Sequence, residues 1–111
     1  MPLTAFRILF RKDTDAMRFG PLARLLDAIQ GEISTESAEL RSSGERMTDC
    51  AAFSFEAMEN GENPGRMSSK IDNLSRQLAF NRGRQALLER QMSFLERTRA
   101  ELARIFHSHR K

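Results

Sequence analysis

Apolar side chains in the second half of the chain recur at alternating steps of three and four residues. The track passes through Met67, Ile71, Leu74, Leu78, Leu88, Met92, Leu95, Leu102 and Phe106, and only Asn81, Gln85 and Arg99 interrupt it. This spacing gathers apolar side chains into a stripe along one side of an α-helix. The pattern therefore predicts a long helix over residues 64–107.

A less regular track of the same kind precedes it. It passes through Leu22, Leu26, Ile29, Ile33, Leu40, Met47, Cys50 and Ala57, with Glu36, Ser43 and Ser54 as interruptions. Pro21, which follows Gly20, is typical of a helix start. We therefore expect another long helix over residues 21–59.

A break within residues 31–45 is also compatible with the sequence. Gly31 and Gly44 each disfavour a helix interior by about 1 kcal/mol relative to alanine. Ser42 and Glu45 have the spacing of a capping box, which marks helix starts. A break here would give three helices instead of two.

The stretch "NGENPG", residues 60–65, predicts the turn between the helices, since it gathers two glycines and a proline. The helix that follows has two compatible starts. Asn63 can cap it with Pro64 in the first turn, or it can begin at Ser69 with Asp72 three residues on.

Such a turn folds the chain into a long antiparallel helical hairpin with a coiled-coil-like seam. In the expected register, the numbers of facing residues add up to about 126. Gly44 then lies close to Gly83, and the two glycines either let the backbones approach or are unrelated weak points. The expected seam residues are Leu26, Ile29, Ile33, Leu40 and Met47 against Ile71, Leu74, Leu78, Leu88, Met92 and Leu95.

Composition and charge support an all-α hairpin. The chain has no tryptophan or tyrosine, and leucine, methionine, alanine, arginine and glutamate form helices well. Residues 13–62 contain eleven acidic and four basic residues, a net charge of −7, whereas residues 66–111 contain four acidic and eleven basic residues, a net charge of +7. Opposite charges on paired helices favour their association and orientation.

The ends of the chain are expected to add only small elements to one domain over residues 1–111. Phe6, Ile8 and Phe10 alternate with polar residues as in a strand, yet Leu3, Phe6 and Phe10 also share one side of a helix. We expect residues 1–19 to form a short N-terminal arm that packs on the hairpin. Residues 108–111 form a basic tail.

Catalytic and cofactor-binding motifs are missing from the sequence. His107 and His109 are two residues apart, so a helix would point them in different directions, and no metal site is expected. Cys50, the single cysteine, is expected to be a buried seam residue. The sequence therefore predicts a protein without enzymatic activity and without a cofactor.

Three apolar residues outside the seam predict an association face: Phe80, Leu87 and Phe94 recur every seven residues. Phe53 and Phe55 lie near the turn. Two helices alone bury one stripe each, so these aromatic residues need another surface. The N-terminal arm, a second copy that completes a four-helix bundle, or a foreign partner helix could each provide it. We expect a homodimer.

The predicted function is a protein–protein interaction or assembly module of the adaptor, chaperone or secretion-accessory type. The alternative is a nucleic-acid-binding or regulatory protein whose second helix contacts phosphates through Arg76, Arg82, Arg84, Arg90 and Arg97.

No apolar run approaches the roughly 18 residues of a membrane span. The first residues also lack the order of an export signal, so we expect a cytoplasmic protein or one that leaves the cell by a route without a cleaved signal.

Overall fold

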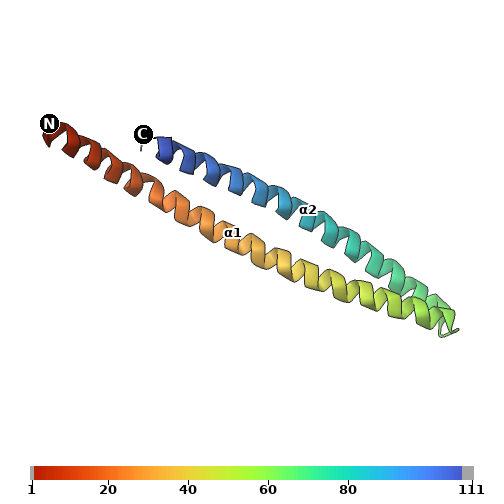
Figure 1. Cartoon of the computed structure of the whole chain (residues 1–111). Helices are drawn as coiled ribbons and strands as arrows, with labels where there is room; N and C mark the ends of the chain where they lie inside the picture. The colour runs from red at the N-terminus through yellow and green to blue at the C-terminus, as the bar shows by residue number, and fades with distance from the viewer. Residues whose placement is uncertain (1, 109–111) are drawn as a thin grey trace. The chain divides into compact units, whose positions relative to one another are not determined.

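The computed structural model describes the backbone of residues 2–108 and the side chains of residues 13–106. Helix α1 spans Pro2–Glu59 and helix α2 spans Pro64–Ser108 (Figure 1). No strand occurs in this described range. Side chains of the two helices contact each other, which confirms the predicted all-α helical hairpin.

A glycine in the left-handed conformation ends α1. Gly61 has a φ of 82°, which a residue with a Cβ adopts only at a cost. Its N–H donates to the Met58 carbonyl at 3.0 Å, and the N–H of Glu62 donates to the Ala57 carbonyl at 3.1 Å. These two bonds form a Schellman motif, which satisfies carbonyls that a helix end otherwise leaves unpaired. Gly61 thus determines the residue at which α1 ends and the turn begins.

Asn63 caps α2. Its carbonyl accepts the first helical hydrogen bond, from the Met67 N–H at 3.1 Å, and Pro64 occupies the first helical position, where a missing N–H costs nothing. Asn63 has a φ of 33°, and asparagine tolerates positive φ better than most residues. Of the two compatible starts, the structure has the one at Pro64 and not the one at Ser69.

The predicted start of the first helix at Pro21 differs from the structure, because α1 begins at Pro2 and passes through Pro21. Residues 2–19 are therefore the first turns of α1 and not a separate arm, and residues 31–45 contain no break. Pro21 cannot donate a hydrogen bond to the carbonyl of Met17. The helical bonds on both sides of this position hold the helix together, so the Gly20–Pro21 pair is not a boundary.

The chain divides into two compact units. The segments Met1–Glu32 and Phe94–Lys111 form one unit, and the segment Ile33–Ser93 forms the other. In the first unit Leu26 and Leu95 are buried. Of the predicted basic tail, only Ser108 lies within the described residues, and it ends α2. The prediction of one domain over the whole chain stays a prediction.

The unit Ile33–Ser93 contains the turn and the two best-buried residues of the described chain. Leu88 and Ser54 are each only 1% exposed, and Ile33 and Ala57 are also buried. Ser54 is buried beside them, and its hydroxyl donates to the Cys50 carbonyl of its own helix at 2.9 Å. A small hydroxyl that bonds its own backbone can lie in an apolar seam without an unpaired polar group.

Candidate association surface

The predicted seam residues lie between the helices. Leu26, Ile33, Leu88 and Leu95 are buried, and the half-buried ones are Ile29, Leu40, Met47, Ile71, Leu74, Leu78 and Met92. Leu22, which also belongs to the predicted track, is exposed. Cys50 is half-buried, as are Glu36 and Ser43, which interrupt the track in the sequence. The 3–4 spacing thus follows the inner side of both helices through its polar positions.

Asn81 brings a buried polar layer into the seam of the unit Ile33–Ser93. It is 3% exposed, and its Nδ2 donates to the Leu40 carbonyl at 2.9 Å. Its Oδ1 accepts a hydrogen bond from Nε2 of Gln85. An asparagine in an apolar seam fixes the register of paired helices at a cost in stability. Asn81 therefore ties α2 to α1 at the level of Leu40.

Gly44 faces this amide and does not meet Gly83, so the expected glycine contact is wrong. A Cβ added at Gly44 would lie 3.4 Å from Oδ1 of Asn81, whereas one added at Gly83 would meet no atom within 4 Å. Two helical steps separate Asn81 from Gly83, which turns Gly83 about 200° away from the seam. Gly44 provides room for the Asn81 amide, and Gly83 lies on the exposed side of α2.

Glu36 and Arg84 join the two helices by a bidentate ion pair. Nε of Arg84 donates to Oε2 of Glu36 at 2.6 Å, and Nη2 donates to Oε1 at 3.1 Å. The hydrogen bond from Arg84, helped by its charge, lowers the pKa of Glu36 although partial burial opposes the shift. The same pair raises the pKa of Arg84. The sequence pattern does not indicate this pair, because long side chains can join residues that are not directly opposite.

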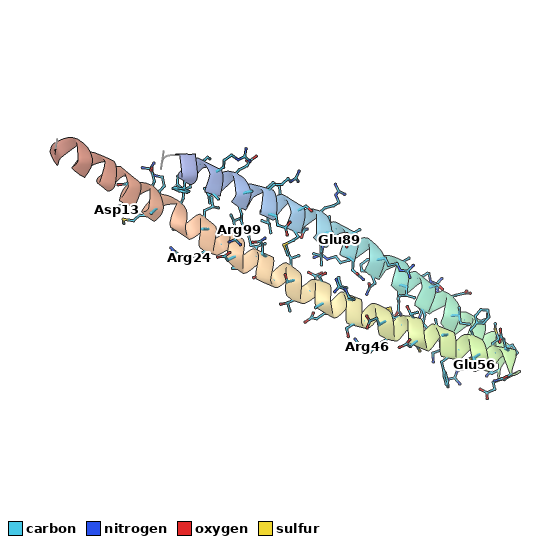
Figure 2. All side chains as sticks on the ribbon, viewed as in Figure 1. Asp13, Arg24, Arg46, Glu56, Glu89 and Arg99 are labelled. Atoms are coloured by element: carbon cyan, nitrogen blue, oxygen red, sulfur yellow. The ribbon has the colours of Figure 1, made fainter. Side chains whose placement is uncertain are left out.

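Arg99 makes a similar bridge in the other unit, where Figure 2 shows it directed toward α1. Its Nη1 pairs with Oδ1 of Asp27 and also donates to Oε1 of Gln30. The ring of Phe19 meets the ring of Phe106 edge to face, with centroids 5.7 Å apart. Arg99 was predicted only as an interruption of the apolar track, and its position in the seam explains why it finds partners on α1.

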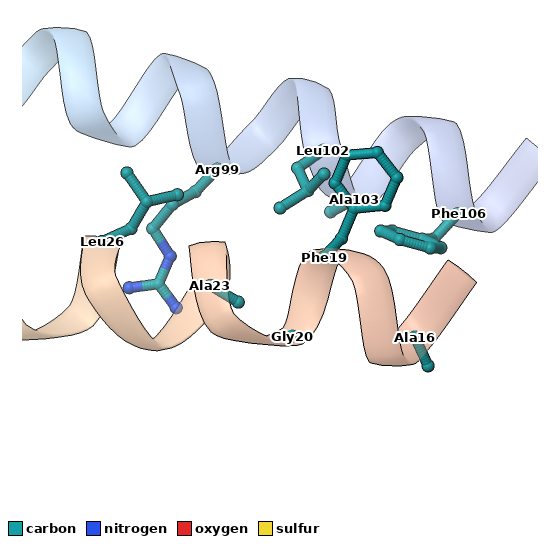
Figure 3. A pocket seen from close by; sticks show the side chains of 9 residues that line it. All are labelled: Ala16, Phe19, Gly20, Ala23, Leu26, Arg99, Leu102, Ala103 and Phe106. Carbon is teal, nitrogen blue, oxygen red and sulfur yellow. The ribbon is translucent and has the colours of Figure 1, made fainter. Parts of the chain in front are cut away.

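An apolar hollow of about 370 Å³ lies between Arg99 and the two phenylalanine rings (Figure 3). Small residues of α1, Ala16, Gly20 and Ala23, line one side of it. Leu26 and Leu102 line it as well. The hollow is open to solvent, and Arg99 is already paired, so the site offers no free charge to a ligand.

The predicted association face is exposed along α2. Phe80 is 80% exposed, Leu87 is 42% exposed and Phe94 is 60% exposed. Phe80 and Leu87 belong to the unit Ile33–Ser93 and Phe94 to the other unit, and along a regular helix a spacing of seven residues keeps side chains on one side. Within the described side chains, residues 13–106, all three are exposed, so residues 13–19 of the N-terminal arm do not cover them. Three large apolar residues in one row on a surface need a reason, since isolated ones are common and rows are not.

Phe80 borders a groove between the helices. The groove has a volume of about 360 Å³, and Leu40, Ser43 and Met47 line it from α1. Arg76, Gln77 and Asn81 line it from α2. Ser43 is a small residue at a half-buried position, where a larger side chain would fill the groove. The groove therefore offers an apolar floor next to an exposed aromatic ring.

The opposite groove of the same unit, named the polar groove here, is lined by more charged side chains. Phe80 and Arg82 flank Asn81, and successive helical side chains differ by 100°, so they project to opposite sides of the seam. The residues around Arg82 include Arg41, Glu45, Thr48, Asp49 and Gln85. One charged residue, Arg76, thus lines the groove beside Phe80, whereas Arg41, Glu45, Asp49 and Arg82 line the polar groove.

Two phenylalanines near the turn also lie on opposite sides of the helix pair. Phe53 and Phe55 are both exposed, and they flank the buried Ser54. Phe55 comes seven residues after Thr48, which lines the polar groove, so Phe55 belongs to that side. Phe53 then lies on the side of Phe80. The association face of this unit therefore includes a residue of α1.

The five arginines predicted as possible phosphate contacts do not form one stripe. They are Arg76, Arg82, Arg84, Arg90 and Arg97. Arg84 is paired with Glu36, and Arg82 lines the polar groove. Arg76, Arg90 and Arg97 are exposed, and multiples of seven residues separate them, so they share one side of α2.

Metal and membrane sites are not found in the described chain. No group of three histidine, cysteine, aspartate or glutamate side chains could hold a metal ion within it. His109 and the side chain of His107 lie outside the described residues. Over the range that the structure describes, neither helix contains an apolar stretch long enough to cross a bilayer.

Comparison of the chain with protein-family models, with curated proteins and with solved structures finds no match. The residues and contacts of the hairpin are therefore the basis for a functional proposal.

Proposed function

We propose that this protein is a non-enzymatic assembly module that associates through Phe80, Leu87 and Phe94. The observation that carries the proposal is the exposure of these three side chains in one row on α2. Burying a phenylalanine or leucine side chain fully contributes about 1.5–3 kcal/mol. A surface that covers the row therefore gains enough free energy to offset part of the cost of association.

The partner in this proposal is a second copy of the chain, which makes a homodimer with four helices. A hairpin has one inner seam and needs a second layer to bury an outer apolar side, and a four-helix bundle supplies it. The apolar groove beside Phe80 and the exposed Phe53 extend the row onto α1, so both helices of the pair contribute to the contact.

The test is the molar mass in solution, measured by light scattering on an eluting size-exclusion peak over a tenfold range of concentration. The variant Phe80→Ser, Leu87→Ser, Phe94→Ser should keep its helical circular dichroism and lose the dimer. Phe55→Ser is the matched control, because Phe55 is exposed on the polar side and its loss should leave the dimer intact. A wild-type monomer at every concentration would refute self-association, and loss of helicity in the triple variant would place these residues in the core of the monomer.

Nucleic-acid binding stays an alternative prediction with less support. Arg76, Arg90 and Arg97 share one exposed side of α2 and could contact phosphates. Arg84, however, is engaged by Glu36, and Arg82 lies elsewhere. The contacts favour association with protein.

A further inference from the structure

We infer that the two hairpins of the dimer point in the same direction, with α1 of each copy over α2 of the other. Both turns then lie at the same end of the four-helix bundle. The inference rests on the proposed self-association and adds the orientation of the partner. It follows from the charges of the two helices and from the position of the groove beside Phe80.

A contact between two identical faces needs a two-fold axis in the plane between them. The axis can run along the helices or across them. An axis along the helices places α1 over the partner's α2, and neighbouring helices are then antiparallel. An axis across the helices places α1 over α1 and α2 over α2, and it sends the two turns to opposite ends.

The net charges of the two helices favour one of these arrangements over the other. The part of the chain that contains most of α1, residues 13–62, has a net charge of −7, and residues 66–111 have a net charge of +7. Like helices stacked on each other would bring −7 against −7 and +7 against +7. The axis along the helices brings each acidic helix onto a basic one. Complementary charge of this kind favours one orientation over the other, even though each exposed ion pair contributes little free energy.

The arginines next to the association face strengthen this preference. Arg76 and Arg90 are each four residues before an aromatic residue of the row, Phe80 and Phe94, and both arginines are exposed. Stacking two α2 helices through the row would bring the arginine side chains of both copies together. Placing α2 on α1 brings them near exposed acidic residues such as Glu39 instead.

The groove supports the same orientation. An axis along the helices keeps each residue level with the same residue of the partner. Phe80 is level with Ser43 in its own chain, because both line one groove. Phe80 of one copy then lies over α1 of the other at the level of Leu40, Ser43 and Met47, where the small serine leaves room for a ring. An axis across the helices stacks α2 on α2, so it does not place Phe80 over α1 of the partner.

The distance between the two turns distinguishes the arrangements. A nitroxide spin label is attached at Glu62→Cys in a Cys50→Ala background, since Glu62 is an exposed turn residue and Cys50 is the chain's single cysteine. With both turns at one end, helices about 10 Å apart and flexible label arms give a distance below about 30 Å. With an axis across the helices at the level of Ser43, 16 residues before Glu59 at 1.5 Å each, the distance is about 50 Å.

The measurement is double electron–electron resonance, with the molar mass recorded on the same labelled sample. A dimer with a distance below about 30 Å is the expected result. A dimer with a distance near 50 Å or longer overturns the orientation and leaves the proposed function standing. A monomer overturns both. The labelled triple serine variant, which should give no intermolecular distance, is the control, and a label at the exposed Glu59→Cys repeats the test if the first site disturbs the turn.

Discussion

Leu87 and Leu88 are neighbours of identical chemistry, and the hairpin gives them opposite roles. Leu88 is 1% exposed in the seam, and Leu87 is 42% exposed on the association face. Leu88→Ala should lower the free energy of unfolding by about 2–5 kcal/mol, because it removes buried carbons and leaves a cavity. Leu87→Ala removes the same three carbons at a site that is already half in water and leaves no cavity. Its cost in a monomer should be about 1 kcal/mol, from about 0.8 kcal/mol per fully buried carbon.

Urea denaturation followed by far-ultraviolet circular dichroism measures both costs, at protein concentrations low enough that the chain is monomeric. The association constant of the Leu87→Ala variant is measured separately. It should be lower than that of the wild type, because the smaller alanine side chain buries less apolar area in the proposed dimer. Equal costs of unfolding for the two variants would refute the reasoning, since they would mean that both leucines lie in the core. A cost below about 1 kcal/mol for Leu88→Ala would remove Leu88 from the seam.

Two of the glycines inside the helices, Gly83 and Gly44, and the bidentate ion pair give further predictions. Gly83→Ala should raise the free energy of unfolding by about 1 kcal/mol, because a Cβ there meets no atom within 4 Å. Gly44→Ala should gain less in the same urea titration, because its Cβ lies 3.4 Å from the Asn81 amide, and a larger gain at Gly44 would contradict the packing. The pKa of Glu36 is lowered by Arg84, so this pair stabilises the fold above the ordinary carboxyl pKa and loses that effect as pH falls through the lowered value. Glu36→Gln should therefore lose less stability than the wild type between about pH 7 and pH 3, and identical pH dependence would show that the pair contributes nothing.

The turn shows what local sequence can decide. Gly61 and Pro64 act through their own backbone geometry, one in the left-handed conformation and one at the first position of α2. Neither needs a distant contact to do so. The seam was predictable for a related reason, because a 3–4 spacing follows the inner side of any helix pair and includes Leu88 and Leu95 without knowledge of their partners.

The start of α1 shows where local rules fail. Gly20 and Pro21 form a typical helix boundary, but α1 continues through them to Pro2. A proline removes one hydrogen bond and a glycine adds flexibility, and neither prevents a helix when the residues on both sides favour it. Such a pair has a limited cost in free energy, and the rest of the helix can outweigh it.

The sequence by itself determined the two helices, the turn at residues 60–65 and the side of each helix that lies in the seam, because these depend on propensity and periodicity. The turn also set the expected register, in which facing numbers add up to about 126, and the contacts Asp27–Arg99 and Gly44–Asn81 agree with it. Only the tertiary structure decided the individual contacts across the seam. It placed Gly44 against Asn81 instead of Gly83, and it joined Glu36 to Arg84. These contacts depend on the register of the helices to within one residue and on the reach of long side chains. The position of the turn gives the register only to within a few residues, so it cannot decide which side chains meet.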